Sequence, residues 1–395
     1  MRVLISGASI AGPALAFWLH RYGIEATVVE RAPAPRPGGQ AVDLRGVGKI
    51  AAERMGLLDQ IRAACTDTRG LSLVDAGGRR RATLTVDQFD GDGPIAEIEI
   101  LRGDIARVLR EATDCEYRYG DRIVALDEQP DGVHVTFESG SPRVFDAVIG
   151  ADGLHSGVRS LLFGDVPLQH LGRYLAFWTA RNHLGLANWS LVHNAPGRGV
   201  GVRTINSNQA FMAFASFHAD DLHHDHRDIG WQKSLVRSRL SGLGWETAEL
   251  VSQIDDAPDF YFDSVSQVHL PSWSRGRVGL LGDAAFCASP SSGQGTSLAL
   301  VGAYVLAGEL AAAPDVPAGL PAYESRLRPW VLANQKMGRT NARASSPSSA
   351  LGVRLQQLGM RLLPHLPQRL LFASMLAVLN GFELPDYSRY LTSVA

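Results

Sequence analysis

The sequence predicts an α/β fold in which a parallel sheet with helices is interrupted by an inserted mixed β-sheet and followed by a C-terminal helical tail. Three separated segments, 3–16, 148–159 and 278–297, each combine a short apolar strand with small residues in the turn that follows. The second and third segments carry a carboxylate in that turn, and the first has Glu30 at the end of the next strand. The region between the last two segments has an alternating apolar and polar pattern, which favours a half-buried sheet. Beyond residue 340, short amphipathic pieces separated by prolines indicate packing helices.

Length and composition indicate a chain with more than one lobe. At 395 residues and 45% hydrophobic content, it can bury one large core and a second, smaller one. A net charge of −2 gives no electrostatic reason to expect nucleic acid or an anionic membrane surface, so small molecules are the expected partners. Three cysteines, Cys65, Cys115 and Cys287, without a CxxC pair argue against a disulfide framework and a structural zinc site, and they fit a reducing cytoplasm.

The first segment is predicted as a strand, a tight turn and a helix. Apolar residues 3–5 suit a strand that is buried on both faces, and the glycine turn 7–12 follows at once. Pro13 suits the first turn of the helix, and Gly23 suits its end. The apolar start could mimic a signal peptide, but cleavage would remove the turn that explains it, so we interpret it as mature sequence.

A second strand, 26–29, completes this unit and ends in Glu30. That carboxylate follows the turn by about 20 residues, where a dinucleotide-binding fold places the acceptor for a ribose hydroxyl pair. The turn keeps Gly7 and Gly12, but Ser9 replaces the middle glycine of the fingerprint. The unit is therefore predicted to be Rossmann-like, and an ordinary tight turn between strand and helix remains the alternative at this point.

The second segment is predicted as a buried strand, 148–150, that ends in the turn Asp152-Gly153. Ser156 is a suitable N-cap for the helix that follows, and Arg159 lies one turn into that helix.

The third segment is predicted as a buried strand, 278–281, that ends in Gly282-Asp283 and leads through the loop 290–295 into a helix. A helix N-terminus behind a glycine-rich loop presents unpaired N–H groups and a partial positive charge, which stabilises the anion that a reduced flavin carries. Asp283 can accept hydrogen bonds from a ribityl chain. The helix has one predicted apolar face, formed by Leu298, Val301 and Val305. Together the three segments indicate bound FAD.

With these motifs in this order, the chain resembles the class A flavoprotein monooxygenases, which have the para-hydroxybenzoate hydroxylase fold, and in particular the tetracycline-inactivating monooxygenases and actinobacterial polyketide hydroxylases. The likeness covers residues 1 to about 340. It implies a discontinuous FAD-binding domain of the GR2 type over 1–70, 95–165 and 272–340, a substrate domain over 71–94 and 166–271, and a C-terminal helical segment over 341–395.

The resemblance also implies the cofactor contacts. The glycine turn, its ribose carboxylate, the Asp-Gly and Gly-Asp motifs, an arginine at a helix start and a loop beside the isoalloxazine all have counterparts in this sequence. The implied residues are Gly7, Ser9, Ile10, Ala11, Gly12, Glu30, Arg31, Gln40, Asp43, Arg45, Arg102, Asp152, Gly153, Asp283, Pro290, Gly293, Gly295, Thr296 and Ser297.

Two positions depart from the family pattern. The family usually has a histidine after Gly-Asp-Ala-Ala and an asparagine after the Gly-x-Gly loop, and this chain has Phe286 and Ser297 there. The polar contacts of those residues are therefore expected to be missing or supplied differently.

The middle region is predicted as an antiparallel or mixed sheet with strands over 174–180, 190–193, 199–205 and 209–217, joined by segment 71–86. The resemblance makes this sheet the substrate lid over the flavin. Only one parity of each strand can face a pocket, so half of its aromatic residues are expected in the core. The substrate candidates are Phe177, Thr179, Phe211, Phe214, Ser291 and Ser292.

Three features receive structural interpretations. The histidine-rich run with His218, His223, His224 and His226 lacks the spacing of a metal site, so we expect a solvated loop and no metal. Cys287 has no adjacent basic partner and is interpreted as a packing residue. The apolar run 370–379 is too short to span a membrane and is predicted as a buried helix.

The resemblance implies chemistry that belongs to the cofactor, so no protein catalytic residue is assigned. Reduced flavin reacts with oxygen to give a C4a-hydroperoxide, which hydroxylates an electron-rich aromatic ring. A single dinucleotide fingerprint favours a transiently bound NADPH or NADH, with Asp152 and Arg159 near its pyrophosphate. We expect a polycyclic, polyketide-like substrate and molecular oxygen as partners of a cytoplasmic monomer or weak homodimer. A simple phenol hydroxylase and a catalytically idle flavoprotein that sequesters a ligand remain alternatives.

Overall fold

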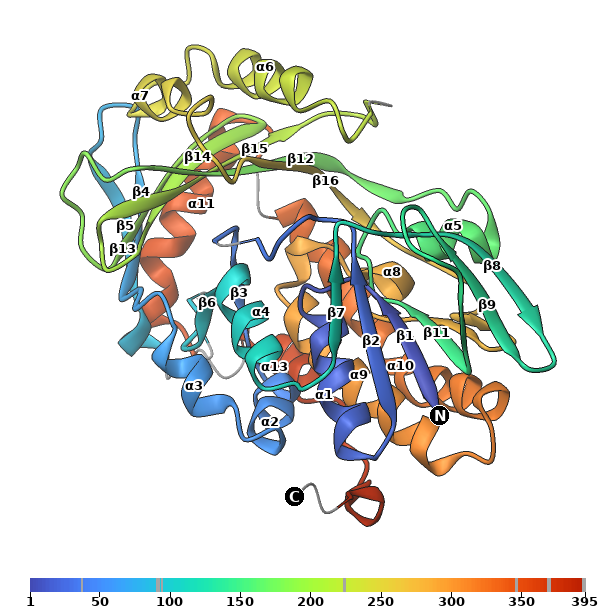
Figure 1. Ribbon diagram of the computed structural model, residues 1–395. Helices are drawn as coiled ribbons and strands as arrows, with labels where there is room; N and C mark the ends of the chain where they lie inside the picture. Colours follow the sequence, from blue (N-terminus) through green and yellow to red (C-terminus); the bar gives the residue numbers. More distant parts are fainter. Residues whose placement is uncertain are drawn as a thin grey trace.

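Two large sheets, two small strand groups and the surrounding helices form the fold (Figure 1). The computed structural model describes residues 1–36, 38–89, 93, 95–222, 225–344, 347–367 and 371–392. One sheet is six-stranded and largely parallel, and the other is seven-stranded and mixed. Each has its own cluster of buried apolar side chains. The predicted α/β class with an inserted mixed sheet is confirmed.

The six-stranded sheet has the order β17-β18-β11-β1-β2-β7, and the five strands from β18 to β7 are parallel. Only β17 at the edge runs antiparallel. Because parallel strands end at one edge, the turns after β1, β11 and β18 lie side by side there. The strands are β1 (Arg2–Ser6), β2 (Glu25–Glu30), β7 (Glu116–Tyr119), β11 (Ala147–Gly150), β17 (Ser274–Arg275) and β18 (Val278–Leu280).

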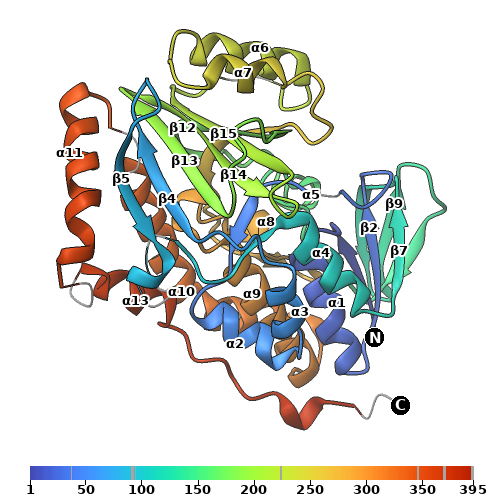
Figure 2. The ribbon, with the colours of Figure 1, turned by 90° about the vertical axis from the view of Figure 1, so that its left-hand side faces the viewer.

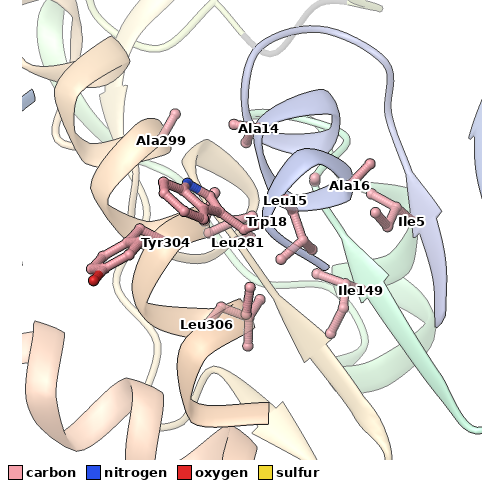
Figure 3. Close-up of a cluster of buried hydrophobic side chains, with 14 of the residues drawn as sticks. Ile5, Ala14, Leu15, Ala16, Trp18, Ile149, Leu281, Ala299, Tyr304 and Leu306 are labelled. Atoms are coloured by element: carbon pink, nitrogen blue, oxygen red, sulfur yellow. The ribbon is translucent and has the colours of Figure 1, made fainter. Parts of the chain in front are cut away.

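Long helices pack against this sheet and against one another. Figure 3 shows the ring of Trp18 from one helix beside Tyr304 from another, with ring centroids 4.8 Å apart. Shorter helices lead from the sheet edge and from its connecting loops. The helices of this part are α1 (Ala11–Arg21), α2 (Val47–Arg54), α3 (Leu58–Ala63), α4 (Arg102–Glu111), α5 (Gly157–Phe163), α8 (Asp283–Phe286), η2 (Pro290–Ser292), α9 (Gly295–Ala312) and α10 (Val316–Ala344).

Helix α9 differs from the expectation of a single apolar face. It is buried on all sides, because it lies between α1, α2 and α10. By length and composition it could cross a membrane, but 83% of it is buried within the protein, as in the core helix of a globular domain. The periodicity of apolar residues therefore did not predict how α9 packs, because a helix that is apolar on all sides has no distinct apolar face.

Two small strand groups extend the sheet unit. A three-stranded antiparallel sheet has the order β10-β9-β8, and a two-stranded ribbon pairs β3 with β6. The ribbon lies beside the start of α4 and carries part of the candidate site. These strands are β3 (Ala41–Asp43), β6 (Glu99–Leu101), β8 (Ile123–Gln129), β9 (Gly132–Phe137) and β10 (Arg143–Phe145).

The seven-stranded sheet has the order β16-β12-β15-β14-β13-β4-β5. The β13–β4 pair is parallel and the others are antiparallel, so the sheet is mixed, and segment 71–86 joins it as predicted. Helices α6 (Ile229–Leu240) and α7 (Thr247–Ser252) cover one face (Figure 1). The strands are β4 (Gly70–Val74), β5 (Arg80–Thr85, followed by η1, Val86–Gln88), β12 (Gln169–Arg181), β13 (Trp189–Ala195), β14 (Arg198–Ile205), β15 (Ala210–His218) and β16 (Tyr261–Gln267).

The chain after α10 connects both units. Helix α11 (Ala350–Leu362), followed by η3 (Leu363–His365), stands against β5 as an outer layer (Figure 2). Helix α13 (Ala373–Leu379) packs on α10, and η4 (Ser388–Tyr390) lies beside α9. The predicted buried helix over 370–379 is corrected: Leu370 lies outside the described residues, Leu371 is 45% exposed, and Leu379 is the buried residue of α13.

Candidate cofactor and substrate site

The glycine turn after β1 is shaped by two close backbone approaches. A Cβ on Gly7, whose φ is +110°, would lie 2.4 Å from the carbonyl oxygen of Ala151. A Cβ on Gly12 would lie 1.9 Å from the carbonyl oxygen of Gly7. Both positions therefore require glycine, and they hold the start of α1 tightly against β1 and β11.

The start of α1 keeps its amide groups available for an anion. No side chain caps it, and Ile10 at the N-cap position has helical φ and ψ. The Nε of Arg102, at the start of α4, donates to the hydroxyl of Ser9 at 3.0 Å. The structure thus brings a guanidinium from a distant segment to the glycine turn, which together make a binding surface for a diphosphate.

Glu30 lies at the end of β2, where the sequence spacing predicts the ribose acceptor. Its carboxylate accepts hydrogen bonds from the amides of Ala8 at 2.9 Å and Ala32 at 2.8 Å. These contacts fix the carboxylate beside the glycine turn. The neighbouring Arg31 is exposed.

Asp283 lines a hollow at the same sheet edge. Its side chain is exposed, although it follows the inner strand β18 and burial raises the pKa of its carboxyl. The charge of Arg102 acts in the opposite direction and lowers that pKa. The Asp283 side chain is accessible to solvent although protein atoms surround it, so it faces an internal space. Gly153 and Gly295 border open space as well, since a Cβ on either would meet nothing within 4 Å.

The loop before α9 brings further polar groups to this space. Gly293 adopts a left-handed conformation, with φ of +63°, and no side chain caps α9. The Oε1 of Gln294 and the Oγ of Ser289 are buried without a hydrogen-bond partner. Both atoms are enclosed by protein, so they are not themselves open to the space in front of α9.

The candidate loop beside the ribbon reaches the same place. The main-chain carbonyl of Gln40 accepts from the amide of Arg102, and Asp43 lies within 3.9 Å of a Cβ on Gly293. Arg45 is nearly buried and is held by Asp43 at 3.1 Å and by the Gly93 carbonyl at 2.7 Å. Arg45 therefore supports the loop through these bonds.

The two family departures have local explanations. The Ser297 hydroxyl donates to the carbonyl of Arg45 at 3.1 Å, and a Cβ on Gly48 would lie only 2.4 Å from it. Ser297 thus joins α9 to the start of α2, where little room is left for a larger residue. Phe286 is 1% exposed and packs on Trp273, with ring centroids 4.6 Å apart, so it belongs to the core.

The Asp-Gly motif has a stronger structural role than the sequence suggested. Asp152 accepts from the Ser156 hydroxyl and from the amides of Gly157 and Val158, which places it at the N-terminus of α5. The predicted N-cap of Ser156 is confirmed by its bond from the Arg159 amide.

Arg159 does not have the role that the sequence suggested. It is 5% exposed, and its guanidinium donates to the carbonyls of Ala284 and Leu154. The expectation that it meets a nicotinamide pyrophosphate is therefore corrected: Arg159 ties β11 and α5 to the Gly-Asp motif.

The seven-stranded sheet turns an aromatic face toward the ribbon. Phe177 and Phe214 are register partners on β12 and β15, and both pack against a cluster with Leu101 and Met212. A Cβ on Gly201 would lie 2.3 Å from the Cζ of Phe214, so the ring lies directly over that glycine. These rings form an apolar wall.

Phe211 belongs to the opposite face of the sheet. It is 0% exposed and packs beneath α6 and α7 with Trp178 and Phe217. The alternation of strand β15 therefore places it outside the substrate face, and its nomination as a substrate contact is corrected.

The remaining substrate candidates lie at the border of this face. Thr179 donates its amide and its hydroxyl to the two oxygens of Asp259. Ser292 is buried and bonds within its own loop, through the carbonyl of Ser289 and the amide of Gln294. Ser291 is half-buried, and its carbonyl accepts from Asn341.

Sequence reasoning missed a polar group on β16. The Tyr261 hydroxyl donates to Asp263 at 3.0 Å, and His155 contacts both oxygens of that carboxylate at 3.1 Å. Burial raises the pKa of Tyr261 well above its ordinary value, and the nearby charge of Arg102 lowers it. The alternating pattern just before the Gly-Asp strand was the available signal for these residues.

A second missed contact joins the two sheets through the ribbon. Arg203 on β14 and Glu99 on β6 form an ion pair at 2.6 Å, and the carboxylate also accepts from the hydroxyls of Thr66 and Thr68. Glu99 is nearly buried, so the pair fixes the aromatic face relative to the ribbon. No motif in the sequence marks this pair.

The histidine-rich run contacts the segment before α5, and Cys287 is buried. His226 stacks on His155 with ring centroids 4.6 Å apart, while His223 and His224 lie outside the described residues. Among the residues that the structure does describe, no group of three or more metal ligands occurs. Cys287 is 5% exposed, and burial raises the pKa of its thiol well above the ordinary value.

The residues at the sheet edge fit FAD. Uncapped helix starts and Arg102 suit a diphosphate, Glu30 suits a ribose, and Asp283 faces the space that a ribityl chain needs.

Comparisons with known sequences agree with this assignment. A family profile described as FAD binding domain matches residues 1–336. An uncharacterized protein of Mycobacterium tuberculosis is 43% identical over 352 residues, which cover 87% of this chain and 94% of that protein. A flavin-dependent monooxygenase of Legionella longbeachae is 37% identical over 342 residues, which cover 86% of this chain and 88% of that enzyme.

Solved structures give the same picture. The tetracycline destructase Tet(55) is 36% identical, with a TM-score of 0.85 and coverage of 98% of both chains. A salicylate hydroxylase in complex with its substrate is 20% identical with a TM-score of 0.71, covers 100% of this chain and 99% of its own, and shows a shared fold.

Proposed function

This chain belongs to the FAD binding domain family and is a class A flavin-dependent monooxygenase of the aromatic-hydroxylase type, and from that premise we propose that it hydroxylates a polycyclic, polyketide-like aromatic compound with NADPH or NADH as electron donor. One observation carries the proposal: the aromatic face of the seven-stranded sheet packs against Ala41 and Leu101, next to Gln40 and Arg102 of the flavin site.

The substrate class follows from the chemistry of that face. Phe177, Phe214 and Met212 offer flat or polarisable apolar surface, which suits stacked rings. The tetracycline destructases, whose name points to a polycyclic compound, are similar over nearly their whole length. We therefore place a polycyclic substrate ahead of a simple phenol. A role in antibiotic biosynthesis or in antibiotic resistance is consistent with this class.

The protein's own residues bind, orient and exclude water. FAD supplies the redox chemistry and oxygen activation when it is bound. Glu30, Ser9 and Arg102 would hold its adenosine and diphosphate end, and Asp283 would accept from its ribityl hydroxyls. The wall with Phe177 and Phe214 would orient the substrate ring and keep water from the reacting atoms.

The electron donor is proposed to bind transiently. The sequence has a single dinucleotide fingerprint, which the cofactor uses. A cytoplasmic enzyme with access to NADPH or NADH, acting as a monomer or weak homodimer with molecular oxygen as co-substrate, is the simplest arrangement.

The test measures oxygen transfer directly. Purified protein with FAD is mixed with NADPH or NADH and with tetracycline or salicylate as probes, under dioxygen labelled with ¹⁸O. We expect the polycyclic probe to accelerate NAD(P)H oxidation and the product to contain one labelled oxygen. A product oxygen from water, or flavin reduction that no ligand accelerates, contradicts the proposal; the second result favours a ligand-sequestering flavoprotein. Acceleration by salicylate alone favours the simple phenol.

A designed variant makes this test independent of folding. Gly295 has open space around its Cβ position, so Gly295→Val should fold but fill the hollow in front of α9. We expect hydroxylation to fall at least about a hundredfold, as misplacement of reacting groups commonly does. An unchanged rate in Gly295→Val would remove this loop from the site.

A further inference from the structure

Exposed apolar side chains gather on one C-terminal helix. Among the described residues, fifteen large apolar side chains are exposed, and six of them lie between 351 and 371. On α11 the exposed fractions are 66% for Leu351, 58% for Leu355, 49% for Leu358 and 48% for Leu362. Isolated exposed leucines are ordinary, but a contiguous group marks an interaction surface.

The four leucines form one stripe. Their spacing of four, three and four residues places them on the same side of an α-helix. The other side is anchored, because Val353 is 8% exposed and Met360 packs against the cluster of Leu84 and Phe89. Ser349 caps the start of the helix. The exposure therefore belongs to a docked helix, which stands as an outer layer beside β5 (Figure 2).

The charged side chains of α11 itself have one sign, although Asp87 is exposed on the neighbouring η1. Between Glu324 and Glu383 the sequence has seven arginines and one lysine, and it has no aspartate or glutamate. Arg354 and Arg361 are exposed on α11, seven residues apart and next to the leucines. The exposed Arg80 lies on the neighbouring strand β5. The net charge of −2 over the whole chain conceals this local excess.

Two occupants could cover such a surface, and the charges discriminate between them. A two-fold pairing of α11 with its copy in a second chain would bring the like-charged arginines together, with no carboxylate from this segment to compensate. An anionic lipid surface complements both features, since leucines enter the acyl boundary while arginines reach the phosphates.

We propose that α11 docks this protein on an anionic lipid surface, with Leu351, Leu355, Leu358 and Leu362 at the acyl boundary and Arg354 and Arg361 toward the head groups. The helix lies against the seven-stranded sheet, so docking brings the substrate unit close to the lipid. The surface lies outside the flavin site, and the proposal goes beyond the enzyme's reaction.

Vesicle binding of the FAD-loaded full-length protein tests the proposal. We expect it to float with vesicles of phosphatidylglycerol and phosphatidylcholine and to bind pure phosphatidylcholine roughly tenfold less. Binding should weaken as salt rises, because exposed charges are screened. The double variant Leu355→Gln with Leu358→Gln, and separately Arg354→Gln with Arg361→Gln, should each lower binding by roughly tenfold or more.

The matched control is Leu161→Gln on α5, where the leucine is 42% exposed but isolated from α11. It should bind vesicles as the unchanged protein does. All variants should keep their FAD content and their NAD(P)H oxidation without vesicles, which separates this proposal from the proposed reaction. No binding to anionic vesicles at low salt overturns the proposal. Sedimentation gives the second outcome that overturns the proposal: the protein is a dimer, and Leu355→Gln with Leu358→Gln makes it a monomer while vesicle binding stays unchanged. That result would assign the stripe to a second copy of the chain.

Discussion

The edge of the parallel sheet and the aromatic face of the second sheet are built in different ways. At the edge, the backbone forms most of the site: Gly7 and Gly12 allow close approach, and uncapped helix starts present amides. On the aromatic face, side chains form the surface: Phe214 lies over Gly201, and Arg203 is paired with Glu99. The first region depends on where a side chain is forbidden, and the second on which side chain is present.

This difference sets what each region tolerates. A backbone-built site fails when a Cβ intrudes, since neighbouring backbone cannot move aside. A side-chain-built face changes its preference when one ring is exchanged and keeps its fold. Substitutions in the two regions should therefore separate into loss of cofactor on one side and altered substrate use on the other.

The largest expected effect is from Gly12→Ala. The new Cβ would lie 1.9 Å from the carbonyl oxygen of Gly7, so α1 must move off the turn. We expect loss of bound FAD and a destabilisation of about 3 kcal/mol or more, from overpacking at a rigid position. Absorbance of the flavin and urea unfolding measure both. Gly359→Ala on α11, with nothing near its Cβ position, is the control and should be neutral or stabilising; equal behaviour of the two variants would contradict the backbone account.

The next effect concerns the ion pair between the sheets. Glu99→Gln leaves Arg203 without its carboxylate in a nearly buried place, where the side chains are 5% and 22% exposed. We expect about 2–3 kcal/mol of lost unfolding free energy, reduced from the fully buried value because Arg203 is partly solvated. The exposed pair of Arg62 and Glu97 provides the comparison, and Arg62→Ala should cost less than about 1 kcal/mol. Equal losses of unfolding free energy in chemical denaturation would show that the Arg203–Glu99 pair does not act as a buried ion pair.

The third prediction tests the ribose assignment. Glu30→Ala removes the acceptor beside the glycine turn and should weaken FAD binding by roughly 1–3 kcal/mol, the cost of charge-assisted hydrogen bonds. Titration of the cofactor-free protein with FAD and with FMN gives the measurement. FMN lacks adenosine, so its affinity should be low in both proteins and change little. Full FAD affinity in the variant would reject the assignment.

The same contrast explains what the sequence could predict. The geometry of the turns after the strands restricts the residue types there, so the sequence predicted the roles of Gly7, Gly12 and Asp283. The strands of the second sheet were predicted from the alternation of apolar and polar residues. Phe211 and Arg159 were misassigned, because residue type alone does not say which face of β15 a ring occupies or which carbonyls a guanidinium meets. The Arg203–Glu99 pair joins residues about a hundred positions apart, and no local pattern contains it.

The fourth prediction uses the raised pKa of Asp283. Burial raises it, so the folded protein holds the proton more strongly than the unfolded chain does. An ionised Asp283 therefore costs stability above its folded pKa, and that cost disappears as pH falls below the ordinary carboxyl range. In FAD-free protein, Asp283→Asn should raise the melting temperature on the order of 1–2 °C near pH 8 and leave it unchanged near pH 3. FAD affinity should fall in the variant near pH 8, since the ribityl hydroxyls lose an anionic acceptor there. A lower melting temperature at pH 8 would show that the carboxylate is stabilised in the free protein.

The smallest expected effects come from a matched pair on one strand, Phe211→Leu and Phe214→Leu. The two rings are three residues apart on β15 and point to opposite faces of the sheet. Phe211→Leu changes a fully buried ring under α6 and α7, so it should cost about 1 kcal/mol of unfolding free energy with KM unchanged. Phe214→Leu exchanges a ring of the proposed substrate wall, so it should raise KM for the polycyclic substrate severalfold at nearly constant stability. Urea unfolding and steady-state kinetics on both variants separate the two outcomes. If Phe211→Leu instead changed KM while Phe214→Leu only lowered stability, the substrate would approach from the α6 side and the face assigned here would be the wrong one.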